Sequence, residues 1–131
     1  MGLVERVKLL SVLFNDKMEK SIDELTLDEI FEGMTAAFDP QAAGNWDTLI
    51  QFNILSGGES KKYNMTIKNG TCTLSKGEAE GVKLTITMEE KDFRAIIKGD
   101  LRGEVAYMTG KLRARGNMND LMRLGSVFKK K

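Results

Sequence analysis

The sequence predicts an α+β fold of two layers, in which a five-stranded and mostly antiparallel sheet carries helices on one face. In five short segments apolar residues alternate with polar ones, which is the period of a half-buried strand. In other segments apolar residues recur every three or four positions, which is typical of an amphipathic helix. Because each element has a single apolar face, these faces have to be buried together in two layers. The opposite face of the sheet, rich in Thr, Lys, Asn and Arg, is expected to meet water.

The chain is expected to fold as one domain preceded by a helical extension. With 131 residues it is long enough for a single core. Residues 3–18 have apolar side chains at helical spacing, so we divide the chain into an amphipathic extension at 1–23 and a domain at 24–131. The extension is expected to pack on its own domain or on a second copy, giving a possible homodimer. Membrane contact is disfavoured because acidic and basic residues are mixed at its polar positions.

The first helix of the domain is expected to begin after Thr26. Thr26 and Glu29 have the spacing of a capping box, in which each side chain accepts a bond from the backbone N–H of the other residue. The apolar face of this helix comprises Leu27, Ile30, Phe31, Met34 and Phe38. Asp39 is expected to end the helix, because the residue before Pro40 is pushed out of helical geometry. Residues 41–46 predict a turn or a short helical piece.

Three strands joined by tight turns are expected next. Apolar residues alternate within 46–54, 61–68 and 71–75. The sequence SGGES at 56–60 supplies the first reversal, and Asn69-Gly70 supplies the second. The three strands therefore form an antiparallel meander. Cys72 lies in the third strand, where we interpret it as a small buried hydrophobic residue rather than a reactive thiol.

The last part of the chain is expected to run strand, helix, helix, strand, helix. Residues 82–88 alternate strictly, and the period then becomes helical until Gly99, which is expected to stop the helix. A second, shorter apolar set ends at Gly110, and residues 111–115 alternate again. Asn117 or Asn119 is expected to cap the final helix. The apolar stripe of that helix comprises Met118, Leu121, Met122 and Phe128. The two helices between the last two strands form a crossover that could place those strands parallel.

A series of short motifs in this region resembles the sterol carrier protein 2 (SCP2) domain. The series contains TITM at 85–88, DF at 92–93, Gly99, Ala106, GKL at 110–112, GNM at 116–118, and Met122 with Leu124. The resemblance covers about residues 24–129 and implies an SCP2-like fold with an apolar tunnel for fatty acyl chains, acyl-CoA or sterols. Eukaryotic members of the family often end in a peroxisomal Ser-Lys-Leu address, whereas this chain ends in KKK. A stand-alone prokaryotic-type member is therefore expected.

Composition argues against catalysis and against nucleic-acid binding. The chain has no histidine and one cysteine, which excludes an intrachain disulfide, a Cys/His zinc site and an imidazole triad. No GxSxG or P-loop pattern occurs, so we expect no enzyme and no cofactor. The net charge is +1 and the aromatic residues lie at core spacing, which does not favour nucleic acid. An unpaired cysteine, no export signal and no apolar run of roughly 20 residues favour a cytoplasmic protein without stable membrane insertion.

The family resemblance implies that residues of the apolar helix stripes contact a lipid. Methionine is flexible and polarisable, so methionine-rich walls suit chains of differing length. We expect an apolar small molecule to be bound by Phe31, Met34, Phe38, Phe93, Ile96, Ile97, Val105, Met108, Leu112, Met118, Leu121, Met122 and Phe128. The candidate headgroup contacts are Lys98, Arg102 and Arg123.

Two alternatives to lipid carriage stay open at this point. The same apolar residues are also what a close-packed core requires, because core and tunnel share one chemistry. The domain could also be a non-enzymatic scaffold or dimerisation module that assists a partner enzyme acting on acyl groups.

Overall fold

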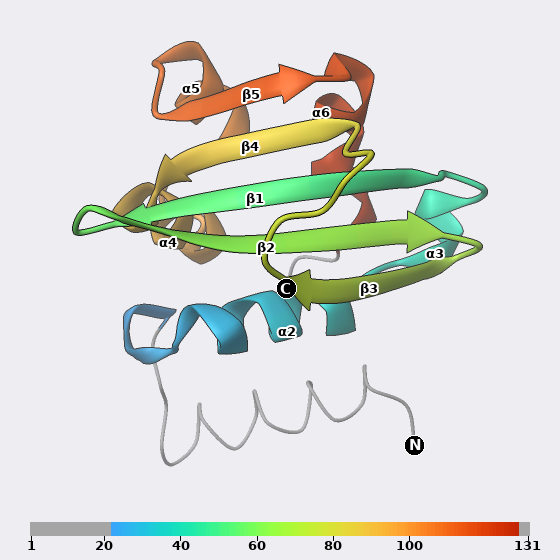
Figure 1. The fold of residues 1–131 in the computed structure, drawn as a ribbon, viewed down its shortest axis with the longest axis horizontal. Helices are drawn as coiled ribbons and strands as arrows, with labels where there is room; N and C mark the ends of the chain where they lie inside the picture. The colour runs from blue at the N-terminus through green and yellow to red at the C-terminus, as the bar shows by residue number, and fades with distance from the viewer. Residues whose placement is uncertain (1–21, 129–131) are drawn as a thin grey trace.

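The centre of the structure is a five-stranded sheet with the strand order β3-β2-β1-β4-β5 (Figure 1). The computed structural model describes residues 22–128; the extension expected at residues 1–23 lies almost wholly outside this range, and with it the possible homodimer contact. The strands are β1 (Thr48–Ser56), β2 (Glu59–Lys68), β3 (Thr71–Lys76), β4 (Leu84–Glu89) and β5 (Leu112–Gly116). The α-helices are α2 (Leu27–Ala36), α3 (Pro40–Ala43), α4 (Glu90–Lys98), α5 (Gly103–Met108) and α6 (Met118–Leu124), and two 3-10 turns are η2 (Ile22–Glu24) and η3 (Gly125–Val127). The predicted α+β class is confirmed.

Local signals place the boundaries of the helices. The capping box of Thr26 and Glu29 is present at the start of α2. Asn117, rather than Asn119, caps α6 by accepting bonds from two backbone N–H groups. Gly99 ends α4 in the left-handed conformation, with φ of 88°. The prediction was wrong for Phe38, because α2 ends at Ala36 and Phe38 instead forms an isolated antiparallel bridge with Phe128.

The core lies between the sheet and the helices and contains an aromatic cluster. The fully buried Phe31 ring of α2 has its centroid 4.2 Å from that of Tyr63 and 5.0 Å from that of Phe93, both stacked. It also meets Phe52 edge-on at 5.2 Å. These contacts join α2 and α4 to β1 and β2. Cys72 is half-buried beside this core on β3, and burial raises the pKa of its thiol to about 12, in agreement with a non-reactive role.

The last two strands are antiparallel, so the two-helix crossover does not place them parallel, which the sequence had left possible. Leu112 of β5 lies opposite Met88 of β4, so the two-helix connection starts and ends at the same end of the sheet. The parallel pair is instead β1 with β4. The chain leaves β3 at the far edge, passes β2 and β1, and enters β4 in the direction of β1. The return segment therefore sets the direction of β4 relative to β1, and the two-helix connection sets the direction of β5 relative to β4.

The return segment, residues 77–83, also covers part of the face that was expected to meet water (Figure 1). The Gln51 side-chain amide donates to the carbonyl of Gly77 at 3.1 Å and accepts from the backbone N–H of Ala79 at 3.1 Å. The Asn64 amide donates to the same Gly77 carbonyl at 3.0 Å. Gln51 and Asn64 are buried as a result. The polar groups of Gln51 and Asn64 therefore bond to the return segment of the same chain and not to water.

Gly116 allows β5 to approach the chain entering β4. Its φ is 118°, and a Cβ atom there would lie 2.3 Å from the backbone oxygen of Lys83. The next residue, Asn117, donates its backbone N–H to that same oxygen at 2.8 Å. The glycine of the GNM motif is thus required by backbone conformation and by contact.

We expect Gly116→Ala to lower the free energy of unfolding by about 2 kcal/mol, because the strained backbone and the contact with Lys83 cannot both be relieved. Urea denaturation measures this change. The control is Gly33→Ala in α2, where a Cβ meets open space and the free energy of unfolding is expected to rise by up to about 1 kcal/mol. An unchanged urea midpoint for Gly116→Ala would contradict the assignment.

Candidate functional site

The predicted lipid-binding residues fall into three groups by exposure. Those in the closed core are Phe31, Phe38, Phe93 and Leu112. Those packed against the core but half-exposed are Met34, Ile96, Ile97, Leu121 and Phe128. Those exposed to solvent are Val105, Met108, Met118 and Met122. The structure brings some together in pairs, Phe31 with Phe93 and Phe38 with Phe128, whose ring centroids are 6.1 Å apart.

Helices α5 and α6, which precede and follow β5, both carry exposed apolar side chains. We define the α5–α6 apolar surface as the five large apolar residues that are exposed among residues 22–128: Val105, Tyr107, Met108, Met118 and Met122. Met108 and Met122 are 81% and 82% exposed. Tyr107 was not among the predicted lipid-binding residues, although its position beside Met108 in a short apolar segment was a signal for it. Groups of exposed apolar residues often mark binding surfaces, whereas apolar residues scattered singly over a surface do not.

The final helix is rotated relative to the predicted stripe. Asp120 is 7% exposed, whereas Met122 points away from the core. The Asp120 carboxylate accepts a bond from the Trp46 indole N–H at 2.8 Å and from the Thr48 hydroxyl at 2.6 Å. Because a buried carboxylate has to be bonded, this pair of donors turns the Asp120 side of α6 inward. The expected stripe is therefore corrected: Leu121 and Leu124 pack on the core, and Met118 and Met122 face outward.

Further contacts hold α6 and the segment after it. The Arg123 guanidinium lies 5.1 Å from the centroid of the Trp46 ring and donates to the backbone oxygen of Ala43 at 2.7 Å. After the helix, the Asp39 N–H donates to the carbonyl of Val127 at 2.7 Å. Arg123, a predicted headgroup residue, thus also ties α6 to α3.

The other two predicted headgroup cations have acidic neighbours. The Lys98 ammonium lies 3.0 Å from the Asp23 carboxylate and 3.7 Å from that of Asp100. The hydrogen bond with Asp23 raises the pKa of Lys98. The Arg102 guanidinium lies 3.3 Å from the Glu104 carboxylate, and both side chains are largely exposed, so this pair is weak. Arg102 is consequently the most available of the three for an anionic headgroup.

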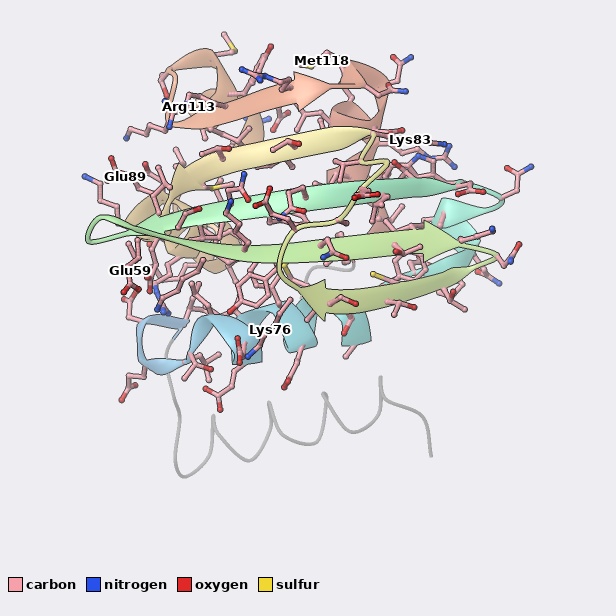
Figure 2. The ribbon with its side chains drawn as sticks, in the orientation of Figure 1. Glu59, Lys76, Lys83, Glu89, Arg113 and Met118 are labelled. Atoms are coloured by element: carbon pink, nitrogen blue, oxygen red, sulfur yellow. The ribbon has the colours of Figure 1, made fainter. Side chains whose placement is uncertain are left out.

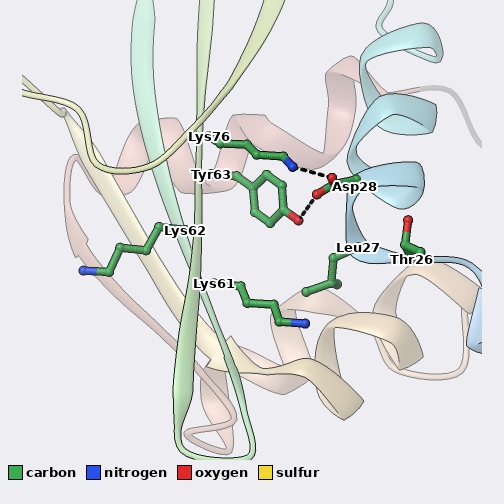
Figure 3. A pocket seen from close by; sticks show the side chains of 7 residues that line it. All are labelled: Thr26, Leu27, Asp28, Lys61, Lys62, Tyr63 and Lys76. Carbon is green, nitrogen blue, oxygen red and sulfur yellow. Dashed lines mark hydrogen bonds and ion pairs between the residues drawn. The ribbon is translucent and has the colours of Figure 1, made fainter.

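Two surface pockets are lined by residues other than the five of the α5–α6 apolar surface. The first, about 400 Å³, is lined by Thr26, Leu27, Asp28, Lys61, Lys62, Tyr63 and Lys76 (Figure 3). Its Asp28 carboxylate accepts a bond from the Tyr63 hydroxyl and lies 2.5 Å from the Lys76 ammonium, and these bonds lower the pKa of Asp28. The second, about 330 Å³, is lined by Met88, Glu89, Lys91, Asp92, Thr109, Gly110, Lys111 and Arg113. Most residues that line the two pockets are polar or charged, and none of the predicted site residues lines either.

Comparison with known proteins identifies relatives of the described domain. The SCP-2 sterol transfer family matches residues 27–129. Hydroxysteroid dehydrogenase-like protein 2 of Xenopus laevis is 29% identical over 113 residues, which are 86% of this chain and 27% of that protein. Sterol carrier protein 2 of Homo sapiens is 32% identical over 71 residues, which are 54% of this chain and 13% of that protein. The chain thus spans little more than a quarter of the first relative and less of the second.

Solved structures share the fold. Sterol Carrier Protein 2 Like 2 from Aedes aegypti has a TM-score of 0.67 at 22% identity, over 78% of this chain and 95% of its own. The sec-alkylsulfatase Pisa1 from Pseudomonas sp. has a TM-score of 0.71 at 18% identity, over 83% of this chain and 17% of its own. The same fold therefore occurs as nearly a whole protein and as a small part of an enzyme. Within residues 22–128, no helix has the length and apolar character that crossing a bilayer requires.

We expect Asp120→Ala to lower the free energy of unfolding by about 3 kcal/mol, because it leaves the buried Trp46 and Thr48 donors without their acceptor. Urea denaturation measures the change, and fluorescence of the single tryptophan, Trp46, reports the local environment. The exposed neighbour Asp47 provides the control, since Asp47→Ala should change stability by less than about 0.5 kcal/mol. Equal effects of the two substitutions would contradict this account of α6.

Proposed function

This chain belongs to the SCP-2 sterol transfer family, and on that premise we propose that it carries an apolar small molecule on the α5–α6 apolar surface. The ligand class is a fatty acyl chain, an acyl-CoA or a sterol-like lipid. The single observation that carries the proposal is that the exposed large apolar side chains of residues 22–128 all lie on α5 and α6. Four of those five residues are ones that the sequence and the family resemblance select for lipid contact: Val105, Met108, Met118 and Met122.

The chemistry of this surface suits an aliphatic ligand. Methionine side chains have three rotatable bonds and a polarisable sulfur, so Met108, Met118 and Met122 adapt to ligands of different length and shape. Covering them with an acyl chain removes apolar area from water on both partners. A half-buried chain of about 16 carbons contributes roughly 6 kcal/mol before entropy losses, which is compatible with micromolar affinity.

The deeper predicted residues would form the floor beneath the ligand. Leu112 of β5 is buried in the core, and Ile96 and Ile97 of α4 are half-exposed and pack against the same core. Phe31 and Phe93 lie within the aromatic cluster, and we assign them support of this floor rather than direct contact. For an anionic headgroup we favour Arg102, whose only close acidic partner among the described residues is the exposed Glu104.

Relatives support an acyl ligand. One solved structure of the same fold is a palmitated SCP2L2 from Aedes aegypti, at 21% identity and a TM-score of 0.66. Palmitate is named only for that Aedes aegypti protein. For this chain, palmitate is a suitable probe of the proposed ligand class. The proposed role is non-catalytic, and the expected cytoplasmic location is part of the proposal.

A second candidate function is a scaffold that serves a partner enzyme. This second function is favoured by the small share of the larger proteins that the domain matches. The matched regions form 27% of the hydroxysteroid dehydrogenase-like protein and 17% of the alkylsulfatase. In such arrangements the domain accompanies a larger enzyme. Dimerisation through the N-terminal extension would be a variant of this role.

Native mass spectrometry of the chain purified without detergent separates the two functions. A carrier should retain a fatty acid or phospholipid, seen as a mass increment that organic extraction removes. An empty domain found in a stoichiometric complex with an enzyme would favour the scaffold and contradict carriage.

We expect Met122→Asp to weaken binding of a fluorescent fatty acid by about tenfold, because it places a charge where the acyl chain would lie. Stability should change little, since Met122 is 82% exposed and fills no core. The matched control is Asn119→Asp, which adds the same charge to an exposed position of the same helix and should leave affinity nearly unchanged. Fluorescence titration and urea denaturation measure the two properties; normal binding by Met122→Asp would remove α6 from the site.

A further inference from the structure

The edge strand β5 has a concentration of positive charge that the overall composition conceals. The chain has a net charge of +1, yet the segment from Val105 to Met118 contains Lys111, Arg113 and Arg115 and no acidic residue. All three basic residues are exposed. Among the ion pairs found within residues 22–128, none involves these three. We call Lys111, Arg113 and Arg115 the β5 basic edge.

The strand period places the β5 basic edge on the outer face of the sheet. Leu112 is buried in the core and Ala114 packs against it, so the basic residues that alternate with them point to the opposite side. Within the sheet Arg113 lies opposite Thr87 and Arg115 opposite Thr85, which are uncharged neighbours. The strand terminates the sheet, so the positive charges form a line along one border of the molecule.

Nearby acidic groups do not neutralise this line. Glu89 and Asp92 line the same pocket as Lys111 and Arg113. Lys91 lines that pocket too, and its ammonium lies 3.9 Å from the Glu89 carboxylate. At the other end of the strand, Lys83 adds a further exposed cation (Figure 2). The border therefore keeps an excess of positive charge.

Exposed methionines lie at both ends of the β5 basic edge. Met108 precedes the strand by four residues and is 81% exposed, and Met118 follows it immediately. Figure 2 shows Arg113 and Met118 along the same border of the sheet, far from Lys76 and Glu59 at the other side. A line of cations ended by flexible apolar side chains is complementary to an anionic bilayer surface, where cations meet phosphate and apolar tips enter the interface.

We propose that the β5 basic edge, with Met108 and Met118 at its ends, docks this domain on the surface of an anionic phospholipid bilayer. Docking is peripheral and reversible, because about three cations bind a charged bilayer only moderately and salt screens the attraction. An acidic protein surface is the competing occupant. The bilayer is favoured because the flanking Met108 and Met118 are exposed apolar side chains that line neither of the two pockets. Docking places the α5–α6 apolar surface next to the lipid phase, so a ligand would not have to cross water.

Vesicle co-sedimentation of the full chain tests the proposal. Wild-type protein should bind phosphatidylcholine vesicles that contain about 30 mol% phosphatidylserine, should bind pure phosphatidylcholine vesicles at least about tenfold more weakly, and should be released by about 0.5 M NaCl. Arg113→Glu/Arg115→Glu should weaken binding to the anionic vesicles by at least about tenfold. The matched control is Lys61→Glu/Lys68→Glu, which makes the same change in net charge at exposed positions of β2 and should bind much more tightly than the β5 variant.

Each outcome decides the proposal. The proposal is overturned if the wild-type protein does not bind anionic vesicles. This holds even if the wild-type protein binds an acidic protein through β5. Equal losses in the two charge-reversal variants also overturn it, since net charge alone would then explain binding. Titration of a soluble fluorescent fatty acid is run in parallel. Neither variant alters the α5–α6 apolar surface, so failure of fatty-acid binding in the wild type rejects the carrier function separately from bilayer docking.

Discussion

The carboxylate of Asp120 lies in the interior and accepts hydrogen bonds from the Trp46 indole and the Thr48 hydroxyl. A buried carboxylate without such donors would be strongly unfavourable, so this contact fixes the rotation of α6 about its axis. It also joins two parts of the chain that are far apart in sequence, the start of β1 and the final helix. The exposure of Met118 and Met122 is a consequence of this rotation. The proposed ligand surface thus depends on a polar contact on the opposite side of the same helix.

The molecule separates a closed core from an open apolar surface. Phe31, Phe52, Tyr63 and Phe93 pack against one another at 4.2 to 5.2 Å through the Phe31 ring, and none of them belongs to α5 or α6. Within residues 22–128, no buried side-chain nitrogen or oxygen lacks a hydrogen-bond partner. The aromatic cluster is therefore formed by α2, α4 and the sheet alone. Helices α5 and α6 can keep apolar side chains in solvent without loss of the core.

The two proposed surfaces use different physical forces at neighbouring places. Ligand binding on the α5–α6 apolar surface would depend mainly on apolar area, and salt would affect only the contact of an anionic headgroup with Arg102. Docking through the β5 basic edge depends on charge and weakens as salt rises. Because α5 leads directly into β5 and α6 follows it directly, the two surfaces share Met108 and Met118. This adjacency is what would connect carriage of a lipid with contact to the membrane that supplies or receives it.

The sequence by itself determined the elements, most of their ends and the family. Thr26 with Glu29, Asn69-Gly70, Gly99 and Asn117 act on their own backbone within a few residues, so their effects could be predicted without knowledge of the fold. The predicted set of candidate site residues likewise includes four of the five exposed apolar residues of α5 and α6.

The fold, in contrast, decides the direction of the strands and which side chains of each element are buried. Gln51 and Asn64 are buried by the return segment, β4 and β5 run antiparallel because their connection returns to the end where it began, and Asp120 is inward while Met122 is outward. Hydrophobic periodicity missed the burial of Gln51, Asn64 and Asp120 because it assumes that polar side chains meet water, whereas these side chains bond to partners as many as 74 residues away in the chain. Periodicity carries no information on strand direction, so it left the pairing of β4 and β5 open.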